Sequence, residues 1–526
     1  MIVQVSFHLA LIVAILLIIM LANRIKVAYP VMLVMAGLLI SFVPGLPVLH
    51  IDPELIFIIF LPPLLYDAAF AISPKELWRW RRIIGSFAFI VVFLTAFSVA
   101  IAANFFIPGM TLALGFLLGG IVSPPDAVSA SSILKFVKVP RRLSSILEGE
   151  SLLNDASSLI IFRFALIAVA TGQFFFLEAT LTFVWMVVGG VAVGLLVGWL
   201  FMKAHRYLPT DENMDIVLTL VAPFVMYIGA EELHSSGVLA VVSGGLFQSI
   251  KRHDFLRSSS RLRGANVWQS IVFVLNGLVF MLIGLDLPEI TEALDQEGIS
   301  VGTAIGYGLL VSAVLIIVRT LSAFGAVLVT LIVGRFATVA DRNPGYKAPI
   351  VISWTGMRGV VSLAAALSIP HYITDGVPFP HRNLILFITF IVITVTLLIQ
   401  GLTLPWLIKA VKLPDYKDYI PDSEAEAKLK RGLAQKALEY LNSQYSNVNN
   451  HHFTLQYMIN KWQAKTQDGD IELEMPEDTR TIYLDVIEKQ REWLLKKNAH
   501  DGYIDEEVIR KYLEQLDIEE ERLRFM

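Results

Sequence analysis

The feature that most constrains this chain is a series of apolar blocks, each about 20 residues long, separated by short runs that contain Pro, Gly or charged residues. A helix of about 20 residues crosses the roughly 30 Å of hydrocarbon in a bilayer. The blocks lack the apolar and polar alternation of membrane barrel strands. Charged residues make up only 17% of the chain, against about 25% in a typical soluble protein. The sequence therefore predicts an all-α, multi-pass membrane protein.

Thirteen transmembrane helices are predicted from these blocks. The first begins directly after Met1, with no basic region before it and no small-residue cleavage site after it. We therefore expect a retained helix rather than a cleaved signal peptide. The spans are expected at residues 3–22, 27–43, 52–72, 83–105, 110–135, 143–170, 174–201, 214–230, 235–250, 267–287, 300–332, 348–370 and 382–410.

The charge of the connecting loops gives the orientation, because Lys and Arg accumulate in short cytoplasmic loops. The loops on one side of the predicted membrane contain a single Lys or Arg residue, Arg382, whereas every loop on the other side contains at least two. Basic and non-basic loops thus alternate along the chain, which supports the count of thirteen helices, because an error of one helix would disrupt the alternation. We expect a cell-membrane protein (in the inner membrane if the source is bacterial) with its N-terminus outside and its C-terminus in the cytoplasm. The basic loops lie at 24–26, 75–82, 135–142, 203–206, 251–263 and 335–347.

The composition changes near residue 411, which divides the chain into a transmembrane domain, 1–411, and a helical cytoplasmic tail, 412–526. The tail contains 17 Lys and Arg against 24 Asp and Glu, a net charge of −7. Bulk charge therefore does not favour nucleic acid or anionic lipid as its partner. Two roles remain open for the tail: regulation or assembly, and a solvated accessory domain.

Several kinds of chemistry are excluded by motifs that the sequence lacks. There are no cysteines, so disulfides, thiol catalysis and thiolate-bound metals are excluded. No phosphate-binding loop, His-Glu-x-x-His motif or Gly-x-Ser-x-Gly motif occurs. We expect a transporter that needs no cofactor, and not an enzyme.

Eight ionisable residues within the predicted spans stand out. A charge in hydrocarbon costs several kcal/mol unless it is paired or hydrated, so each is a functional candidate. Residues near span ends, such as Glu148 and Arg163, can instead reach interfacial water. Arg358 is positioned to pair with Glu150, and Arg319 to balance another carboxylate, with the pairing left open. The eight are Asp67, Asp126, Glu148, Glu150, Asp155, Arg163, Arg319 and Arg358.

The most informative run is Glu150-Ser151-Leu152-Leu153-Asn154-Asp155, inside the sixth span. In a helix, Ser151 and Asp155 share one face and Asn154 lies beside them. Their oxygens suit an alkali cation, and a carboxylate in a low-dielectric site holds a proton more readily than one in water. Na⁺ and a proton can therefore compete for Asp155, with Ser151 as a second ligand to the metal ion. The alternative is an Asp155 that is merely hydrogen-bonded to a neighbouring helix.

Two predicted spans contain features that interrupt a helix. The fifth contains Pro124-Pro125, which removes two backbone donors. The twelfth contains Thr355-Gly356-Met357-Arg358-Gly359. If spans 1 to 6 and 8 to 13 form two inverted six-helix repeats joined by span 7, the breaks occupy matching positions. Matching breaks at mid-membrane predict a transporter whose ion site lies between helices five and twelve.

These motifs resemble the cation/proton antiporter superfamily, and in particular its branch of bacterial NhaP-type and animal NHE-type sodium/proton exchangers. The resemblance covers residues 1 to about 410. Its most specific element is Gly149-Glu150-Ser151-Leu152-Leu153-Asn154-Asp155. Four supporting motifs follow the order of the family: Leu61-Pro62-Pro63 before Asp67, Ser123-Pro124-Pro125-Asp126, His234-Ser235-Ser236-Gly237 and Met357-Arg358-Gly359.

The resemblance implies a thirteen-helix fold with crossed, broken helices five and twelve. It also implies a homodimer in which a core domain moves against a dimerisation domain. Asp155 would carry Na⁺ and H⁺ in turn, with Ser151, Asp126 and Asp67 around the ion. Asp67 remains open to a second position, near the cytoplasmic entrance.

The resemblance also implies how charge is balanced. Glu150 would pair with Arg358. An Asn154–Asp155 pair, where electrogenic relatives carry two aspartates, implies electroneutral one-for-one exchange. Our own charge count agrees, since one carboxylate proton is traded for one monovalent cation.

The chain departs from the family pattern at two points, and the substrate has open alternatives. Pro124-Pro125 replaces the usual threonine before Asp126, so a backbone carbonyl of Ser123 or Pro124 is expected to substitute as a ligand. Asn276 stands where animal exchangers often carry an acidic residue. We expect exchange of Na⁺, with Li⁺ as a further substrate, for H⁺ by alternating access. The alternatives are a K⁺/H⁺ antiporter of the same fold and, less favoured because a carbonyl-filter motif is lacking, a cation channel.

Overall fold

The computed structural model describes residues 2–43, 53–135, 137, 139–172, 176–285, 287–296, 298–333, 335, 345–374, 377–414, 422–445, 459–460, 463, 477–500 and 506–524. The first predicted residues of the third and seventh spans, 52 and 174, lie outside these ranges. Parts of the basic loops 135–142 and 335–347, and much of the tail, also lie outside them. The described chain divides into two compact units, Met1–Asp415 and Tyr416–Met526.

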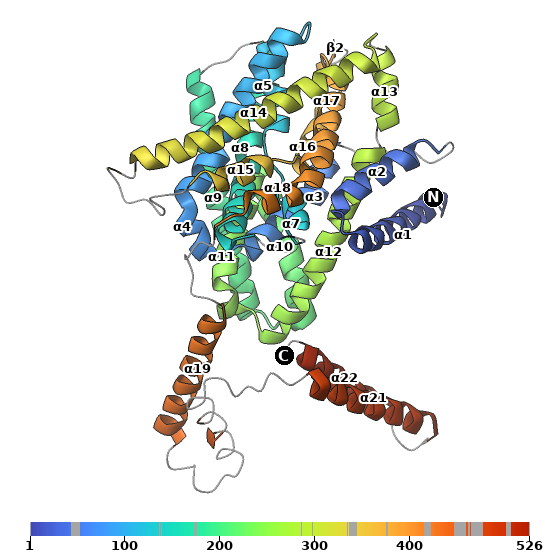
Figure 1. Ribbon diagram of the computed structural model, residues 1–526, viewed down its shortest axis with the longest axis vertical. Coiled ribbons are helices and arrows are strands. Elements are labelled where there is room, and N and C mark those ends of the chain that lie inside the picture. Colours follow the sequence, from blue (N-terminus) through green and yellow to red (C-terminus); the bar gives the residue numbers. More distant parts are fainter. Residues whose placement is uncertain are drawn as a thin grey trace. The chain divides into compact units, whose positions relative to one another are not determined.

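The first unit is built almost entirely of helices, with one two-stranded ribbon between α16 and α17 (Figure 1). Its elements are α1 (Ile2–Ile25), α2 (Tyr29–Ser41), α3 (Pro53–Ala71), α4 (Pro74–Gly85), η1 (Ser86–Val91), α5 (Val92–Phe106), α6 (Leu112–Val122), α7 (Ala127–Leu134), α8 (Arg141–Thr171), α9 (Phe176–Tyr207), α10 (Glu212–Glu232), α11 (Gly237–Phe255), α12 (Ser258–Leu285), α13 (Leu287–Gln296), α14 (Val301–Val333), α15 (Lys347–Trp354), α16 (Val360–Leu367), β1 (Tyr372–Thr374), β2 (Val377–Pro378), α17 (Arg382–Val395), η2 (Thr396–Gln400) and α18 (Gly401–Val411).

Every predicted span contains helical structure among its described residues. Among the described helices, 8 are long and apolar enough to cross a membrane, and the shorter apolar helices are Leu9–Ile25, Tyr29–Ser41 and Phe57–Ala71. The chain is therefore a multi-pass, helical membrane protein. The count of thirteen spans and the two inverted repeats remain predictions.

Both predicted helix breaks are present. The fifth predicted span is divided into α6, which ends at Val122, and α7, which begins at Ala127. The twelfth is divided into α15 and α16, with residues 355–359 between them. In addition, the fourth and thirteenth spans each contain a π-helical turn, η1 and η2, which the sequence analysis did not predict. Such turns often mark functional sites, because they change the direction of the side chains that follow.

Glycines bring α6 into close contact with both of its neighbours. A Cβ at Gly115 would lie 2.7 Å from the carbonyl oxygen of Ala100 on α5, and a Cβ at Gly120 would lie 2.9 Å from the backbone nitrogen of Phe162 on α8. Neither position tolerates a side chain without a backbone shift. The helix that leads into the first break is therefore held tightly between α5 and α8.

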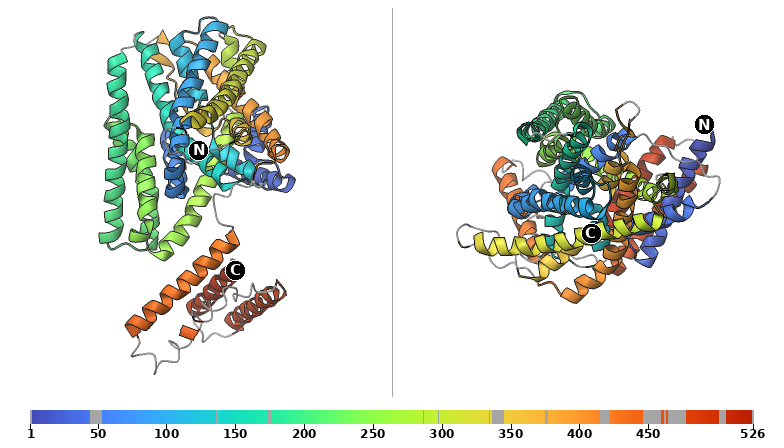
Figure 2. Two further views of the ribbon diagram at one scale, coloured as in Figure 1. Left: turned by 60° about the vertical axis from the view of Figure 1, so that its left-hand side comes forward. Right: turned by 90° about the horizontal axis from the view of Figure 1, so that it is seen from above.

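A second group of helices consists of α9, α10 and α11, which run side by side, with α3 packed on α11 (Figure 2). Small residues again allow close approach: Gly194 on α9 leaves no room for a side chain beside the Ala240 carbonyl on α11. This group also has polar cross-links, since the Tyr66 hydroxyl donates to Gln248 Oε1 at 2.5 Å and Gln248 Nε2 donates to the Gly198 carbonyl at 3.2 Å. We call α4 to α8 the first helix group and α9 to α11 with α3 the second helix group.

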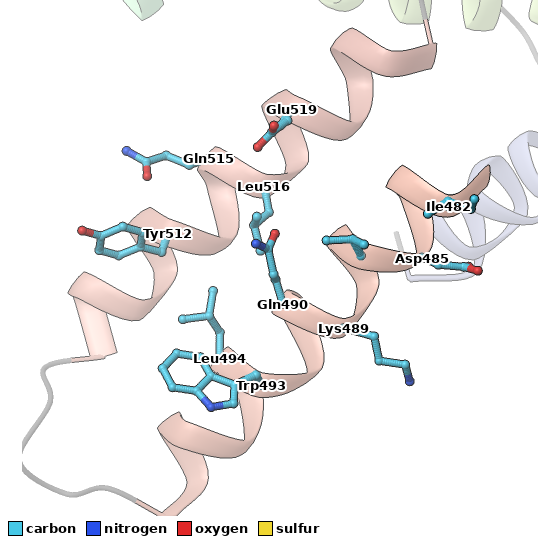
Figure 3. A pocket seen from close by; sticks show the side chains of 11 residues that line it. Ile482, Asp485, Lys489, Gln490, Trp493, Leu494, Tyr512, Gln515, Leu516 and Glu519 are labelled. Atoms are coloured by element: carbon cyan, nitrogen blue, oxygen red, sulfur yellow. The ribbon is translucent and has the colours of Figure 1, made fainter. Parts of the chain in front are cut away.

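The second unit contains α19 (Asp422–Tyr445), α21 (Glu477–His500) and α22 (Glu506–Arg524). Ile487 packs with Leu516 and Leu523 between α21 and α22. Arg491 joins the same two helices through Asp517, at 2.8 Å, and Glu520, at 2.7 Å. A groove of about 700 Å³ runs between them (Figure 3), with Trp493 and Tyr512 among its lining residues.

Candidate functional site

The two helix breaks meet at the centre of the first unit, where Figure 1 shows α7, α15 and α16 close together. The backbone nitrogen of Asp126, in the first break, donates to the Met357 carbonyl in the second at 2.7 Å. Arg358 Nε donates to the Val122 carbonyl, the last residue of α6, at 2.7 Å. A side chain at Gly359 would overlap the Asp126 carboxylate. Each break therefore supplies hydrogen-bond partners for backbone groups that the other leaves free.

Asp126 restarts the helix after Pro124-Pro125. Its carboxylate accepts hydrogen bonds from the backbone nitrogens of Val128, at 2.9 Å, and Ser129, at 3.3 Å. The Ser129 hydroxyl donates to the same carboxylate at 2.5 Å. Asp126 is thus the N-cap of α7, and its oxygens satisfy donors that the new helix cannot satisfy itself.

Two polar residues of α8 hold the first break from the other side. The Ser151 hydroxyl accepts a hydrogen bond from the Ala127 nitrogen at 3.1 Å. Asn154 Nδ2 donates to the Pro125 carbonyl at 3.2 Å. Asn154 is fully buried, and its Oδ1 atom has no hydrogen-bond partner within the described residues. An unpartnered acceptor at this depth is suited to a cation or to a proton donor.

Asp155 is buried, with 8% of its surface exposed. No hydrogen bond or ion pair is found for its carboxylate within the part of the chain that the structure covers. Asp126 lies close enough for the two carboxylates to repel one another when both are charged. A buried carboxylate without a partner needs either a proton or a cation, and carboxylate oxygens suit a hard cation.

The buried arginines do not pair as the sequence analysis expected. Arg319 on α14 binds Glu150 with both guanidinium nitrogens, at 2.6 and 3.0 Å. Arg358 instead donates to the carbonyls of Val122 and Gly356. The predicted pairing of Glu150 with Arg358 is therefore wrong. The physical reason is that the helix breaks expose carbonyls next to Arg358, whereas Arg319 presents its planar fork to the carboxylate.

Two other predicted site residues, Ser123 and Asp67, lie at the end of α6 and on α3. Ser123 is buried at the end of α6, where its hydroxyl donates to the Gly120 carbonyl at 3.4 Å. Asp67 is half-buried on α3, four residues before that helix ends at Ala71. The structure thus joins Ser151 and Asn154 to the break that contains Asp126, and Asp155 follows Asn154 on α8. No described hydrogen bond joins Ser123 or Asp67 to these four residues.

Two residues that support the site, Ser129 and Thr396, were not predicted from the sequence. Ser129 lies three residues after Asp126, the spacing of a helix N-cap and its partner, so this contact could have been predicted. Thr396 in η2 accepts a hydrogen bond from the Arg358 backbone nitrogen at 3.1 Å. Nothing in the apolar sequence around Thr396 signals this contact, because it depends on how α17 packs against the second break.

Comparisons with known proteins agree with this architecture. The transmembrane sodium/hydrogen exchanger family matches residues 10–410. A "sodium, potassium, lithium and rubidium/H⁺ antiporter" of Bacillus pumilus is 34% identical over 73% of this chain. The match covers 58% of the length of that relative. An "uncharacterized Na⁺/H⁺ exchanger" of Mycobacterium bovis is 31% identical over 98% of this chain and 95% of its own. The sodium proton antiporter MjNhaP1 from Methanocaldococcus jannaschii has a similar fold, with a TM-score of 0.61 at 20% identity over 78% of this chain and 99% of its own.

Proposed function

Because this chain belongs to the sodium/hydrogen exchanger family, we propose that it exchanges Na⁺, and also Li⁺, for H⁺ across a cell membrane. The observation that carries the proposal is Asp155, a buried carboxylate without a partner among the described residues, beside a broken helix. The Bacillus pumilus relative, which is named as an antiporter, supports the same class of activity. The protein is proposed as a transporter that binds its two substrates and performs no covalent chemistry.

The proposed cation site is centred on Asp155 and Ser151. Ser151 accepts one hydrogen bond from Ala127 and keeps a second lone pair for Na⁺. Asn154 Oδ1 is a further neutral oxygen without a partner in the described chain. Asp126 adds negative charge nearby. We assign Asp67 and Ser123 to the approach of the ion rather than to its immediate shell.

The exchange cycle follows from the charge of this site. Deprotonated Asp155 binds Na⁺, and protonated Asp155 releases it. The site therefore carries one cation in either loaded state, Na⁺ in one and H⁺ in the other. Glu150 is neutralised by Arg319 and does not take part. This supports electroneutral, one-for-one exchange. We propose that the site opens alternately to the two sides, with the basic loops and the C-terminus in the cytoplasm, and that the protein is a homodimer.

A K⁺/H⁺ antiporter is the second candidate function. The Bacillus pumilus relative is named for potassium and rubidium as well as sodium and lithium, and oxygen ligands by themselves separate Na⁺ from K⁺ poorly. Exchange rates measured in equal concentrations of NaCl, LiCl, KCl and RbCl would rank the cations. Rates in KCl above those in NaCl would replace Na⁺ with K⁺ as the main substrate.

The proposal is tested in vesicles that contain the purified protein and a pH-sensitive dye. A Na⁺ gradient imposed on the wild type should move protons in the opposite direction, whereas Asp155→Asn should be indistinguishable from empty vesicles. Competition has its own signature: where Asp155 is mostly protonated, each unit of acidification weakens the apparent Na⁺ affinity about tenfold. Full exchange by Asp155→Asn would overturn the site, and Na⁺ flux without proton movement would favour the channel.

A further inference from the structure

An ion pair outside the proposed cation site connects the two helix groups. Arg163 on α8 donates to Glu231 at the end of α10, with 2.5 Å between guanidinium nitrogen and carboxylate oxygen. The helix α8 packs chiefly against α4, η1, α5 and α6, with a smaller contact to α11 and α3, whereas α10 packs against α9, α11, α3 and α12. The side chains of Arg163 and Glu231 are 37% and 28% exposed, so this contact is only partly covered by the protein.

Arg163 and Asp155 lie on the same helix, α8, which fixes the position of the ion pair relative to Asp155. Asp155, Leu159 and Arg163 follow one another at intervals of four residues along α8, so they lie along one side of it. Arg163 is about 12 Å from Asp155 along the helix axis. Arg141 is at the basic-loop end of α8, and Arg163 lies toward the other end. Glu231 likewise lies at the end of α10 that is opposite the basic loop 203–206.

Glu231 is held firmly by the second helix group. Its other carboxylate oxygen accepts a hydrogen bond from the Gly237 nitrogen, at the start of α11, at 3.0 Å. The turn between α10 and α11 is also tied to α9, because the Ser236 nitrogen donates to the Met186 carbonyl at 3.1 Å. Glu231 therefore presents a fixed acceptor to which Arg163 can bind and from which it can separate.

We propose that the Arg163–Glu231 ion pair is the outer gate of the transport path, closing the route between Asp155 and the side of the membrane opposite the basic loops. The proposal rests on the proposed function, since a gate requires alternating access. A half-exposed ion pair suits this role because water competes for both partners, which lets the contact open in each cycle. The buried Glu150–Arg319 pair lacks this property and stays closed.

The absence of native cysteines makes a direct test possible. In a Leu159→Cys background, a membrane-impermeant maleimide applied to the outside of intact cells reports access to the path between the gate and Asp155. Arg163→Gln should raise the labelling rate about three- to fivefold, the change expected when a half-exposed ion pair is lost. Glu231→Gln should raise it equally, because the amide oxygen still accepts from Gly237 while the charge is gone. The double variant should label no faster than either single variant, since all three remove one interaction.

Arg263→Gln is the matched control. Arg263 pairs with Glu212 at 2.9 Å and with 58% and 34% exposure, but this pair joins α12 to α10 at the basic-loop end. Its loss should leave labelling of Leu159→Cys unchanged. The gate is refuted if either single variant labels at the background rate, or if the double variant multiplies the two effects. Labelling needs no ion gradient, so the two proposals fail separately. Absence of Na⁺/H⁺ exchange in the wild type would refute the proposed function. The labelling rates would still show whether the Arg163–Glu231 pair closes the path to position 159.

Discussion

Glu150 and Asp155 are two buried carboxylates on the same helix, five residues apart, and their surroundings differ in nearly every respect. Glu150 is 1% exposed and receives two hydrogen bonds from Arg319. Asp155 is 8% exposed and faces a helix break, with no partner for its carboxylate among the described residues. The carboxylate is thus bound by an arginine at position 150 and available to a proton or a cation at position 155.

This difference explains how one helix can serve both structure and transport. A buried carboxylate with a bidentate arginine is neutralised permanently, so taking up a proton or Na⁺ would mean breaking that pair. A buried carboxylate beside free oxygens has its charge compensated only when a cation or a proton binds. The comparison predicts that substitutions at Glu150 chiefly affect stability and that substitutions at Asp155 chiefly affect exchange.

The largest expected effect on stability is that of Glu150→Gln. Removal of this carboxylate leaves Arg319 buried without a counter-charge, which should lower the free energy of unfolding by about 3–5 kcal/mol. Asp155→Asn removes a charge that has no partner in the described chain, so its thermal midpoint should match or exceed that of the wild type. Thermal unfolding of both variants in detergent provides the measurement. Equal losses of stability would break the distinction between the two carboxylates.

The corrected arginine pairing predicts unequal coupling energies. In a double-mutant cycle, Glu150→Gln combined with Arg319→Gln should give a coupling energy of about 2–3 kcal/mol, because these side chains are in direct contact. The same cycle with Arg358→Gln should give a smaller value, since Arg358 donates to the carbonyls of Val122 and Gly356. A larger coupling to Arg358 than to Arg319 would restore the pairing that the family resemblance implied.

Gly359→Ala tests the contact between the two breaks without touching Glu150. The added methyl group would overlap the Asp126 carboxylate, which caps α7. The overlap should lower the free energy of unfolding by about 1–3 kcal/mol and slow Na⁺/H⁺ exchange. Gly325→Ala on α14 is the control, because a Cβ there meets no atom within 4 Å. If both variants exchange at the wild-type rate, the Asp126 contact is not part of the site.

Ser151→Ala should have the smallest effect. It removes the acceptor for the Ala127 nitrogen, and one hydrogen bond of this kind contributes about 0.5–1.5 kcal/mol. We expect weaker apparent Na⁺ affinity with little change in thermal midpoint, measured by exchange rates over a range of Na⁺ concentrations. Unchanged affinity would remove Ser151 from the cation ligands and leave it as a support of the helix break.

Much of this arrangement follows from local sequence. Pro124-Pro125 removes two backbone donors, so the first break could be predicted at these residues, and helical spacing placed Ser151 beside Asp155. A proline pair alone does not decide the matter, because Pro62-Pro63 lies inside α3 without ending that helix. The partner of Glu150 could not be predicted, because Arg319 and Arg358 lie 169 and 208 positions away and only packing decides between them. The π-helical turn that carries Thr396 lies in largely apolar sequence and leaves no local signal.

The central claim, that Asp155 binds Na⁺ and H⁺ in turn, is tested most directly by counting the protons that Na⁺ displaces. Titrating the purified protein with NaCl in a calorimeter, in two buffers of different ionisation enthalpy, gives the number of protons released per Na⁺ bound. Near the pH at which Asp155 is mostly protonated, the wild type should release about one proton per Na⁺. Asp155→Asn should bind no Na⁺ and release no proton, while Asp67→Asn should still release protons. Proton release by Asp155→Asn at the wild-type level would contradict the account.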